Sequence, residues 1–310
     1  MKSAHPAIRF TRASRSWLIR RAVSTNFAKN TANNPLSDGA FTGIRYPLKF
    51  ALVLSCLLLS RSALASSACA LETTEQTHKT HQTNLVRVQR VVDGDTIWLT
   101  DGRKVRIIGI DTPELGHQKA PDEPLARKAS TALRDLLEQA GNQVILRADI
   151  EAKDRYQRDL AHVYLSDGTN LSAWQLQAGH ASVMLIPPNT RNLDCYLDIE
   201  QLARQQRAGI WALPQHKILD AASLPDDSHG FHIIHAKIER ISYGGGATWI
   251  NLVGGMSLQV RDSDGHYFDP GWAQKLRGVN IEARGFIYRS RGQWRMRLRH
   301  PLSIKTTNAR

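Results

Sequence analysis

The chain has 310 residues, of which 42% are hydrophobic and 22% are charged, a composition that is ordinary for a globular protein of one or two domains. Its formal net charge is +13, but residues 1–70 contribute +9 of this through ten Lys or Arg residues against a single acid, Asp38. Residues 71–310 are only mildly basic, so the total charge does not by itself identify a polyanionic partner.

Residues 1–70 are predicted to be a targeting region, with a signal-peptide-like segment at residues 46–70. The apolar run Phe50–Ser60 has eleven residues, about half of the roughly 20 that a membrane-spanning helix needs. Small residues follow it, and both Ala63-Leu64-Ala65 and Ala68-Cys69-Ala70 fit a cleavage pattern. We therefore expect an exported protein, periplasmic or secreted, with no stable membrane span after cleavage.

This region also admits other interpretations. Residues 50–60 would anchor the chain in a membrane if they stayed uncleaved, or they would form a buried core helix. The Arg- and Ser-rich residues 1–45 also suit an organelle transit peptide or a start site assigned too far upstream. Cys69 is a weak candidate for lipidation.

The three cysteines bear on stability. Cys56 and Cys69 lie in the targeting region, so cleavage after Ala70 would leave Cys195 as the only thiol. With that cleavage site no internal disulfide is expected, and core burial alone would stabilise the mature protein. Cys195 has no His-rich surroundings in the sequence that would favour a nucleophile, so we interpret it as a structural thiol.

Residues 71–84 are polar and are predicted to be a linker, and residues 85–212 form the first predicted domain. Short runs rich in Val and Ile alternate with turn residues and with segments of helical periodicity. The predicted strands are Leu85–Val92, Thr96–Leu99, Arg103–Ile110, Gln143–Ala148 and Leu160–Leu165, and the predicted helices are Pro124–Gln139, Leu171–Ala178 and Leu193–Ala208. Five strands with helices inserted late in the order predict a small closed barrel with helices, like an OB-fold.

Residues 213–230 contain proline, aspartate and glycine and are predicted to be a second linker, followed by a β-rich accessory domain at residues 231–304. Its predicted strands are His232–Ile241, Thr248–Val253, Leu258–Arg261, Val279–Tyr288 and Trp294–Leu298. They predict another small, OB-like barrel.

The last strands of this accessory domain interleave basic and aromatic residues. Phe286, Tyr288 and Trp294 lie among Arg284, Arg289, Arg291, Arg295, Arg297 and Arg299. This mixture suits a nucleic-acid surface, and a solvated strand face with ordinary core aromatics is the alternative.

Carboxylates in the first domain predict a site for a hard cation. Asp95 follows a glycine at a strand turn, and Asp111 ends the next predicted strand. Two carboxylates, a backbone carbonyl and waters would make a low-affinity calcium site. Pro113 restricts the conformation of Thr112 and so helps to fix where the Thr112 carbonyl points. Residues 85–211 contain no Cys/His cluster with the spacing of a zinc site.

Two arginines and one glutamate complete the predicted chemistry. Strict strand alternation would place Arg106 and Asp111 on opposite faces, but a bulge at Gly109 would bring them to one side. The planar guanidinium groups of Arg106 and Arg158 suit the oxygens of a phosphodiester. Glu114 is the candidate to accept a proton from the attacking water. Taken singly, these residues would be turn formers and surface ion pairs.

These motifs resemble the thermonuclease (staphylococcal nuclease-like) family over residues 85–211. The matching residues are Val92-Asp93-Gly94-Asp95-Thr96, Arg106, Asp111-Thr112-Pro113-Glu114, Asp154-Arg155-Tyr156, Arg158, Leu160, Ala161 and Gly209-Ile210-Trp211. The resemblance implies that Asp95, Asp111 and the Thr112 carbonyl bind calcium, that Arg106 and Arg158 hold the scissile phosphate, and that Glu114 activates water. Arg155 and Tyr156 are predicted to contact the substrate, and family members leave 3′-phosphate ends on DNA or RNA.

The chain departs from the family pattern at several positions. Gln157 and Asp159 stand where the family often has glycine, which would stiffen that loop and place an acid beside Arg158. Val183 and Leu185 align near tyrosines that line the nucleotide pocket in some relatives, so base stacking there would be weaker.

The leading hypothesis is an exported, monomeric, calcium-dependent nuclease that acts on DNA and/or RNA. A non-catalytic nucleic-acid-binding or scaffold protein built on the same fold is the alternative. A surface-adhesion role for the second barrel is a third, suggested only by the targeting segment.

Overall fold

The computed structural model describes residue 69 and residues 85–116 and 120–307. The predicted targeting region and the linker at residues 71–84 therefore lie outside the described residues, apart from Cys69. The described residues belong to one compact unit, which contains two β-barrels. Within the described ranges, no helix has the length and apolar character needed to cross a membrane.

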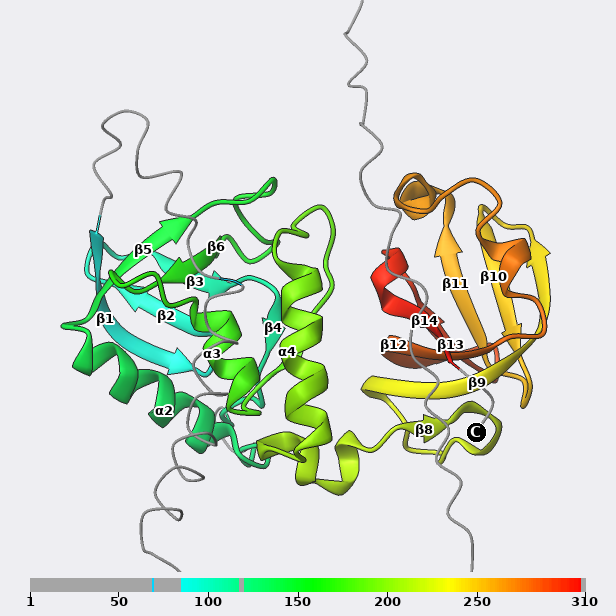
Figure 1. Cartoon of the computed structure of the whole chain (residues 1–310), viewed down its shortest axis with the longest axis horizontal. Coiled ribbons are helices and arrows are strands. Elements are labelled where there is room, and N and C mark those ends of the chain that lie inside the picture. The colour runs from blue at the N-terminus through cyan, green and yellow to red at the C-terminus, as the bar shows by residue number, and fades with distance from the viewer. Residues whose placement is uncertain (1–68, 70–84, 117–119, 308–310) are drawn as a thin grey trace, which may run out of the picture. The chain divides into compact units, whose positions relative to one another are not determined.

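The N-terminal barrel is closed and has five strands in the order β1-β2-β3-β6-β5 (Figure 1). Pairing of β1 with both β2 and β5 closes it. The strands are β1 (Leu85–Asp93), β2 (Thr96–Leu99), β3 (Lys104–Ile107), β5 (Gln143–Arg147) and β6 (Asp159–Tyr164), and β4 (Ile110–Asp111) pairs with β7 (Ser182–Val183) in a separate small sheet. The predicted barrel with inserted helices is confirmed.

Three helices cover this barrel: α2 (Ala126–Gln139), α3 (Leu171–Gln177) and α4 (Leu193–Gln205). Ala129, Leu133 and Leu137 are buried on α2, at the spacing of one helix face. This helix packs beside β1, while α3 packs against α4 (Figure 1). Short 3-10 turns follow at Gly209–Ala212 (η2) and Pro214–His216 (η3).

The predicted interruption at Gly109 is confirmed. The strand ends at Ile107 and the chain resumes extended pairing only at Ile110. Gly109 has φ 87°, and a Cβ there would lie 2.5 Å from Cε2 of Tyr196, so a side chain at this position would be strained and would clash. The break reorients the chain between Arg106 and Asp111.

The C-terminal part forms a second closed ring of strands in the order β9-β10-β11-β13-β12, closed by pairing of β12 with β9. The strands are β9 (Gly230–Tyr243), β10 (Ala247–Leu252), β11 (Ser257–Arg261), β12 (Asn280–Ser290) and β13 (Gln293–Arg297), with β8 (Leu219–Asp220) and β14 (Ile304–Thr307) added at the edges. Its 3-10 turns are η4 (Ala221–Ser223), η5 (Asp262–Tyr267), η6 (Ala273–Leu276) and η7 (Pro301–Ser303). The predicted β-rich barrel is confirmed, and β8 and β14 are strands that the sequence pattern did not indicate.

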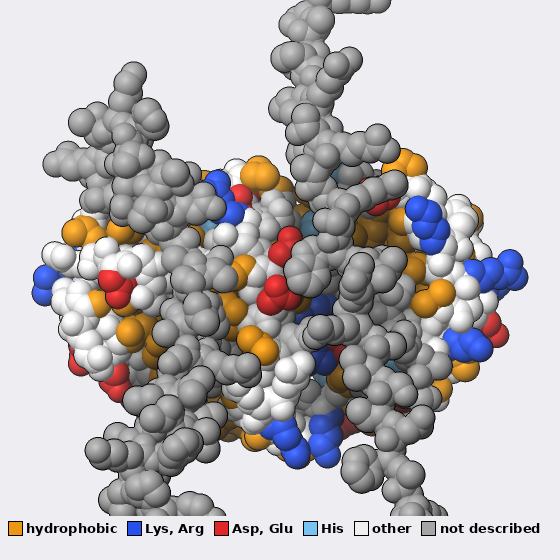
Figure 2. All heavy atoms as spheres, viewed as in Figure 1, with side chains coloured by type: hydrophobic (Ala, Val, Ile, Leu, Met, Phe, Trp, Pro, Cys, Tyr) orange, Lys and Arg blue, Asp and Glu red, His pale blue; other side chains and the backbone are white. Residues whose placement is uncertain are grey.

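The two barrels have separate hydrophobic cores. The first is built around residues such as Ile97, Leu133 and Val163, and the second around Ile250 and Met296. Figure 2 shows Lys and Arg side chains along the outer edge of the C-terminal barrel, with hydrophobic side chains among them.

Two ion pairs join the barrels. Arg284 on β12 makes a bidentate pair with Glu200 on α4, with Nη1–Oε1 and Nη2–Oε2 distances of 2.8 and 2.7 Å. Both side chains are buried, and the same Glu200 carboxylate accepts a hydrogen bond from the Val183 amide at 2.6 Å. Arg204 on α4 pairs with Glu282 on β12 in the same bidentate manner. Because planar forks of this kind fix orientation as well as distance, they hold β12 beside α4.

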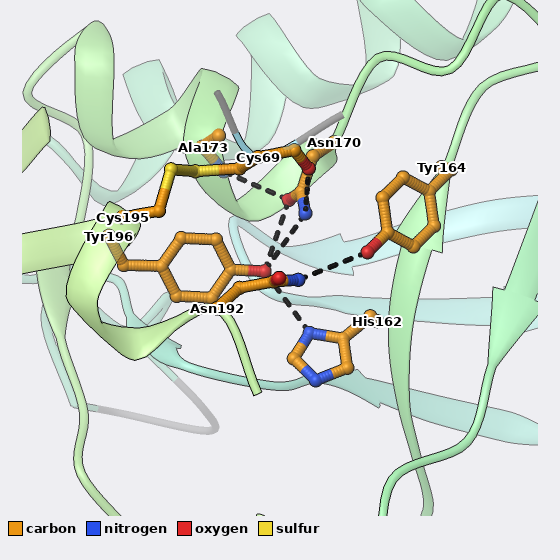
Figure 3. The surroundings of a disulfide bond; sticks show 8 residues. All are labelled: Cys69, His162, Tyr164, Asn170, Ala173, Asn192, Cys195 and Tyr196. Carbon is orange, nitrogen blue, oxygen red and sulfur yellow. Dashed lines mark hydrogen bonds between the residues drawn. A yellow bond between two sulfur atoms is a disulfide. The ribbon is translucent and has the colours of Figure 1, made fainter. Parts of the chain in front are cut away.

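The prediction that the chain has no internal disulfide is wrong. Cys69 and Cys195 form a disulfide with a Cα–Cα distance of 6.0 Å (Figure 3). Cleavage after Ala70, on which that prediction depends, would remove Cys69. Cys69 is instead buried in the first core, and its carbonyl accepts a hydrogen bond from Asn170 Nδ2 at 3.1 Å.

A buried polar network lies beside this disulfide. Tyr196, next to Cys195, has its hydroxyl 3.1 Å from His162 Nδ1 and 3.0 Å from Asn170 Nδ2 (Figure 3). Burial raises the pKa of Tyr196 to about 12, so the hydroxyl stays protonated and can donate as well as accept. The disulfide therefore ties the segment at Cys69 to α4 and to the core under β6.

Loss of the disulfide is expected to destabilise the protein. The linked cysteines are 126 residues apart, and closing a loop of this size in the unfolded chain is worth about 2–5 kcal/mol. Chemical denaturation with and without reductant measures this loss. Cys195→Ser serves as the control, since its stability should be lower and should not respond to reductant. A parent protein whose stability is the same in both conditions would contradict the prediction.

Candidate active site

A cavity of about 610 Å³ opens beside the N-terminal barrel. Six of the eight predicted site residues line it, namely Arg106, Asp111, Glu114, Arg155, Tyr156 and Arg158. The other two, Asp95 and Thr112, are buried. Asp95 pairs with Arg106 at the cavity, and the Thr112 amide donates to Asp95. The structure thus brings together all eight residues from three separate parts of the sequence.

The guanidinium of Arg106 lies between two carboxylates. Its Nη1 is 2.7 Å from Oδ2 of Asp95, and its Nη2 is 2.9 Å from Oδ1 of Asp111. The Asp95 side chain is 1% exposed, whereas the Asp111 side chain is 29% exposed and faces the cavity. One positive charge therefore neutralises only one of two negative charges in a largely buried place.

The position of Asp95 is fixed by hydrogen bonds to both carboxylate oxygens. Oδ1 accepts from Thr96 Oγ1 at 2.9 Å, and Oδ2 accepts from the Thr112 amide at 3.0 Å. The turn that carries Asp95 needs Gly94, because a Cβ there would lie 2.8 Å from the Thr112 side chain. The Asp-Gly-Asp-Thr motif therefore places Asp95 under the loop that begins at Thr112.

Burial raises the pKa values of the carboxyl groups in this cluster. The pKa of Asp95 is raised to about 6 by burial, against the opposing attraction of Arg106 and with a contribution from Asp93. The pKa of Asp111 is also raised to about 6, by burial and by the charge of Asp95. For Glu114 the pKa is raised by burial and then by the charge of Asp95. The cluster therefore has more carboxylate groups than positive charges to neutralise them.

These residues fit a hard divalent cation. Carboxylate and carbonyl oxygens are the ligands that calcium prefers, and the deficit of positive charge favours cation binding. Thr112 Oγ1 is also buried here without a hydrogen-bond partner among the described residues. Within the described ranges, no group of three or more His, Cys, Asp or Glu side chains converges to hold a metal, so backbone oxygens and water would supply the remaining ligands.

Glu114 lies at the cavity next to a second glutamate. The Glu114 amide donates to Oε2 of Glu123 at 2.9 Å, and Glu123 is among the charges that raise the pKa values of Glu114 and Asp111. Sequence reasoning missed Glu123, because it precedes α2 and carries no motif of its own. Glu123 lies beside Glu114 only because the folded chain comes back to Glu114 after residue 120.

Asp154 organises the loop that presents Arg158. Its Oδ1 accepts from the amides of Tyr156 and Arg158 at 2.8 and 3.0 Å, and its Oδ2 is 2.6 Å from Arg158 Nε. Burial alone would raise the pKa of Asp154, but the hydrogen bonds from Arg158 lower it. Gln157 has φ 63° in this loop, which explains why glycine is favourable at that position.

Tyr156 and Arg155 form an exposed pair at the rim. The Tyr156 side chain is 64% exposed, and the Arg155 guanidinium lies 4.7 Å from the centre of its ring. Arg155 Nη2 donates to the Tyr156 hydroxyl at 2.6 Å. A flat aromatic ring with an adjacent cation is suited to contact a base and a phosphate.

The opposite wall differs in detail from the sequence-based expectation. Met184 and Ile186 line the active-site cavity, whereas Val183 is buried in the first core and Leu185 packs against that core. The shift of one residue exchanges the two faces of an extended segment. The Pro187–Pro188 peptide bond that follows is cis.

Arg299 of the C-terminal barrel also reaches the active-site cavity. Its Nη2 donates to the Pro187 carbonyl at 3.2 Å, and the residue is part of the cavity wall. The sequence placed Arg299 on the basic and aromatic surface of the second domain and gave no sign that it would meet the first.

Comparisons with known proteins identify relatives of this chain. The family model described as "Staphylococcal nuclease homologue" matches residues 104–213. A thermonuclease from Staphylococcus intermedius is 35% identical over 127 residues, which cover 40% of this chain and 74% of that protein. A thermonuclease from Staphylococcus hyicus is 31% identical over 175 residues, covering 55% of this chain and 96% of that protein. An uncharacterized endonuclease from Escherichia coli O157:H7 is 35% identical over 130 residues, covering 41% of this chain and 76% of that protein.

The fold and the comparisons together define the class as a nuclease-type OB-barrel protein. The chain belongs to the staphylococcal nuclease (thermonuclease) family.

The metal-free protein is expected to lose stability as pH rises. The folded-state pKa of Asp111 is about 6 and its ordinary value is 3.8, so the folded state binds the proton more tightly. Its stabilising contribution is complete below the ordinary value and disappears as pH rises through about 6.

Asp111→Asn should remove the contribution of Asp111 to this pH dependence. In chelator at about pH 7.5 the variant should be more stable than the parent by about 1–3 kcal/mol, and the difference should vanish near pH 4. Chemical denaturation at the two pH values measures it, with Asp135→Asn on the exposed face of α2 as the control. A variant that is less stable than the parent at the higher pH would contradict the prediction. It would show that the ion pair between Asp111 and Arg106 stabilises the folded state by more than burial of the Asp111 carboxylate destabilises it.

Proposed function

We propose that the protein is an exported, calcium-dependent nuclease that hydrolyses phosphodiester bonds in DNA and/or RNA and leaves 3′-phosphate ends. Membership of a nuclease family supports hydrolysis of nucleic acid. The observation that carries the proposal is the convergence of Arg106, Asp111, Glu114 and Arg158 on one cavity from separate segments.

In this proposal the two arginines hold the phosphate. Arg106 is fixed by its ion pairs with Asp95 and Asp111, and Arg158 is fixed by Asp154. Substrate binding therefore does not have to order either guanidinium group. Hydrolysis builds negative charge on the phosphoryl oxygens, and preorganised guanidinium groups stabilise that charge. Tyr156 and Arg155 contact the nucleotide beside the scissile bond.

Glu114 acts as the general base in this proposal. Its carboxylate accepts a proton from the attacking water, the water oxygen bonds to phosphorus, and the bond from phosphorus to the 5′ oxygen breaks. The 5′ oxygen takes up a proton from solvent water and leaves, and the phosphate stays on the 3′ oxygen. A raised pKa makes Glu114 a stronger base than an ordinary glutamate, which favours this role.

Asp95, Asp111 and the Thr112 carbonyl would hold calcium. When bound, the ion would supply positive charge next to the phosphate and polarise it. A single chain provides every residue in this scheme, so we propose that the protein acts as a monomer.

The disulfide supports export. Disulfides persist in oxidising compartments such as the periplasm and the extracellular space. Because Cys69 belongs to the disulfide, we infer that signal cleavage falls before it, at the Ala63-Leu64-Ala65 motif. The intact mass of the mature protein should correspond to a chain that begins at Ser66. A mature chain that begins at Leu71 would contradict this inference.

Substitution at the proposed catalytic residues tests the function. Glu114→Ala and Arg158→Ala should each lower the rate of DNA or RNA cleavage by about 10²–10⁴-fold, with little change in thermal stability. Glu138→Ala and Arg134→Ala, which remove the same charges from the exposed face of α2, are the matched controls.

The assay follows cleavage of defined DNA and RNA in calcium and in chelator, with identification of the product ends. Cleavage that requires calcium and leaves 3′-phosphates supports the proposal. A parent protein that binds nucleic acid and leaves it intact would instead favour the non-catalytic scaffold.

A further inference from the structure

A second cavity, of about 260 Å³, adjoins the active-site cavity. Met184, Ile186 and Arg299 line both. The walls of the second cavity come from the segment after β7 and from the outer side of β12 in the C-terminal barrel. The two cavities therefore lie side by side, and the second barrel supplies part of the wall next to the proposed catalytic residues.

Strand alternation explains which side chains face the second cavity. Ala283 and Ile287 on β12 point into the barrel core, so Phe286 and Tyr288 between and beyond them point outward. Phe286 is 52% exposed although it is a large aromatic residue in the middle of a strand. Its ring meets that of Phe231 edge to face, with centroids 5.8 Å apart. The Phe286 ring therefore remains exposed beside the active-site cavity.

Guanidinium groups flank these rings in fixed positions. The buried carboxylate of Asp264 accepts from Arg297 Nε and Nη2 at 3.0 and 2.6 Å and lies 3.7 Å from Arg299 Nε. Asp264 thus orients Arg297 and lies within ion-pair distance of Arg299, and one acid beside two arginines leaves a net positive charge. Arg299 also donates to the Pro187 carbonyl, so this charge lies where the two cavities meet.

The outer face continues beyond the second cavity. Arg295 pairs across the strands with Tyr288, and its guanidinium lies 4.8 Å from the centre of the Trp249 ring on β10. Aromatic rings and cations therefore alternate along the outside of β12, β13 and β10. The neighbouring acids Glu200 and Glu282 are already paired with Arg284 and Arg204 and do not offset this charge.

We propose that the face formed by Phe286, Tyr288, Arg297 and Arg299, here named the accessory platform, binds the single-stranded part of a nucleic acid that extends from the active site. Sequence-independent binding of single strands uses this combination of stacking rings and positive charge. The platform lies beside the proposed catalytic cavity, so one strand can occupy both. The inference rests on the proposed function for its substrate class.

Binding of single-stranded oligonucleotides in chelator tests the platform without cleavage. The parent should bind an oligodeoxythymidine of about 12 nucleotides more tightly than one of about four, because only the longer strand reaches the platform. The double substitution Phe286→Ala with Tyr288→Ala should weaken binding of the longer strand by about tenfold or more, the loss of at least one stacked base, and leave the shorter one unchanged.

Matched variants control for folding and for charge. Phe286→Leu keeps apolar volume against Phe231 and removes the ring, so it should fold normally and still weaken binding of the longer strand. Tyr243→Ala removes an exposed aromatic residue of the same barrel that lines neither cavity, and should have no effect. Arg299→Gln should weaken binding of the longer strand, whereas Arg277→Gln, in an exposed loop, should not.

The outcomes separate this inference from the proposed function. Hydrolysis of a short chromogenic phosphodiester reports on the catalytic cavity and should be unchanged in the Phe286 and Tyr288 variants. If the parent cleaves nothing but the platform variants lose binding of the longer strand, the platform stands and the catalytic proposal fails. Equal binding of the longer strand by parent and Phe286 variants would overturn the platform. A Phe286 variant that shifts the protein from dimer to monomer in sedimentation would also overturn it, because a second copy would then occupy this face.

Discussion

The charge cluster of Asp95, Arg106 and Asp111 is the constraint on which the site depends. A buried carboxylate is costly unless it is paired and hydrogen-bonded, and Asp95 meets both conditions through Arg106 and the Thr112 amide. The same contacts fix the chain at Thr112 and so position Glu114 two residues later. Because one guanidinium faces two carboxylates, the cluster keeps a negative charge that suits a divalent cation. The excess negative charge lowers the stability of the folded protein at the place where catalysis is proposed to occur.

Ion pairs connect the C-terminal barrel to helix α4, next to the segment that lines the active-site cavity. The buried pair of Arg284 and Glu200 connects β12 to α4, and Glu200 also holds the Val183 amide. Removing either partner would leave a buried charge without its counterion, which is strongly destabilising. This arrangement brings Arg299 to the cavity wall. The accessory barrel therefore forms part of the wall of the active-site cavity.

Much of this could be predicted from the sequence, because local patterns determine it. Strand alternation and turn residues indicated both barrels, and Gly109 between Arg106 and Asp111 indicated the break that brings them together. Features set by long-range packing could not be predicted. Glu123 comes beside Glu114, and Arg299 reaches the cavity, only through the path of the folded chain. Which of Val183 and Met184 faces the cavity depends on a shift of one residue. The disulfide was missed because its prediction depended on a choice between two cleavage motifs.

A crystal structure with calcium and a short phosphorothioate oligonucleotide would test the central claim most directly. The account predicts an ion about 2.3–2.6 Å from carboxylate oxygens of Asp95 and Asp111, with a backbone phosphate in contact with Arg106 and Arg158. Calcium or phosphate bound away from this cluster, with the three residues still joined as they are here, would contradict it.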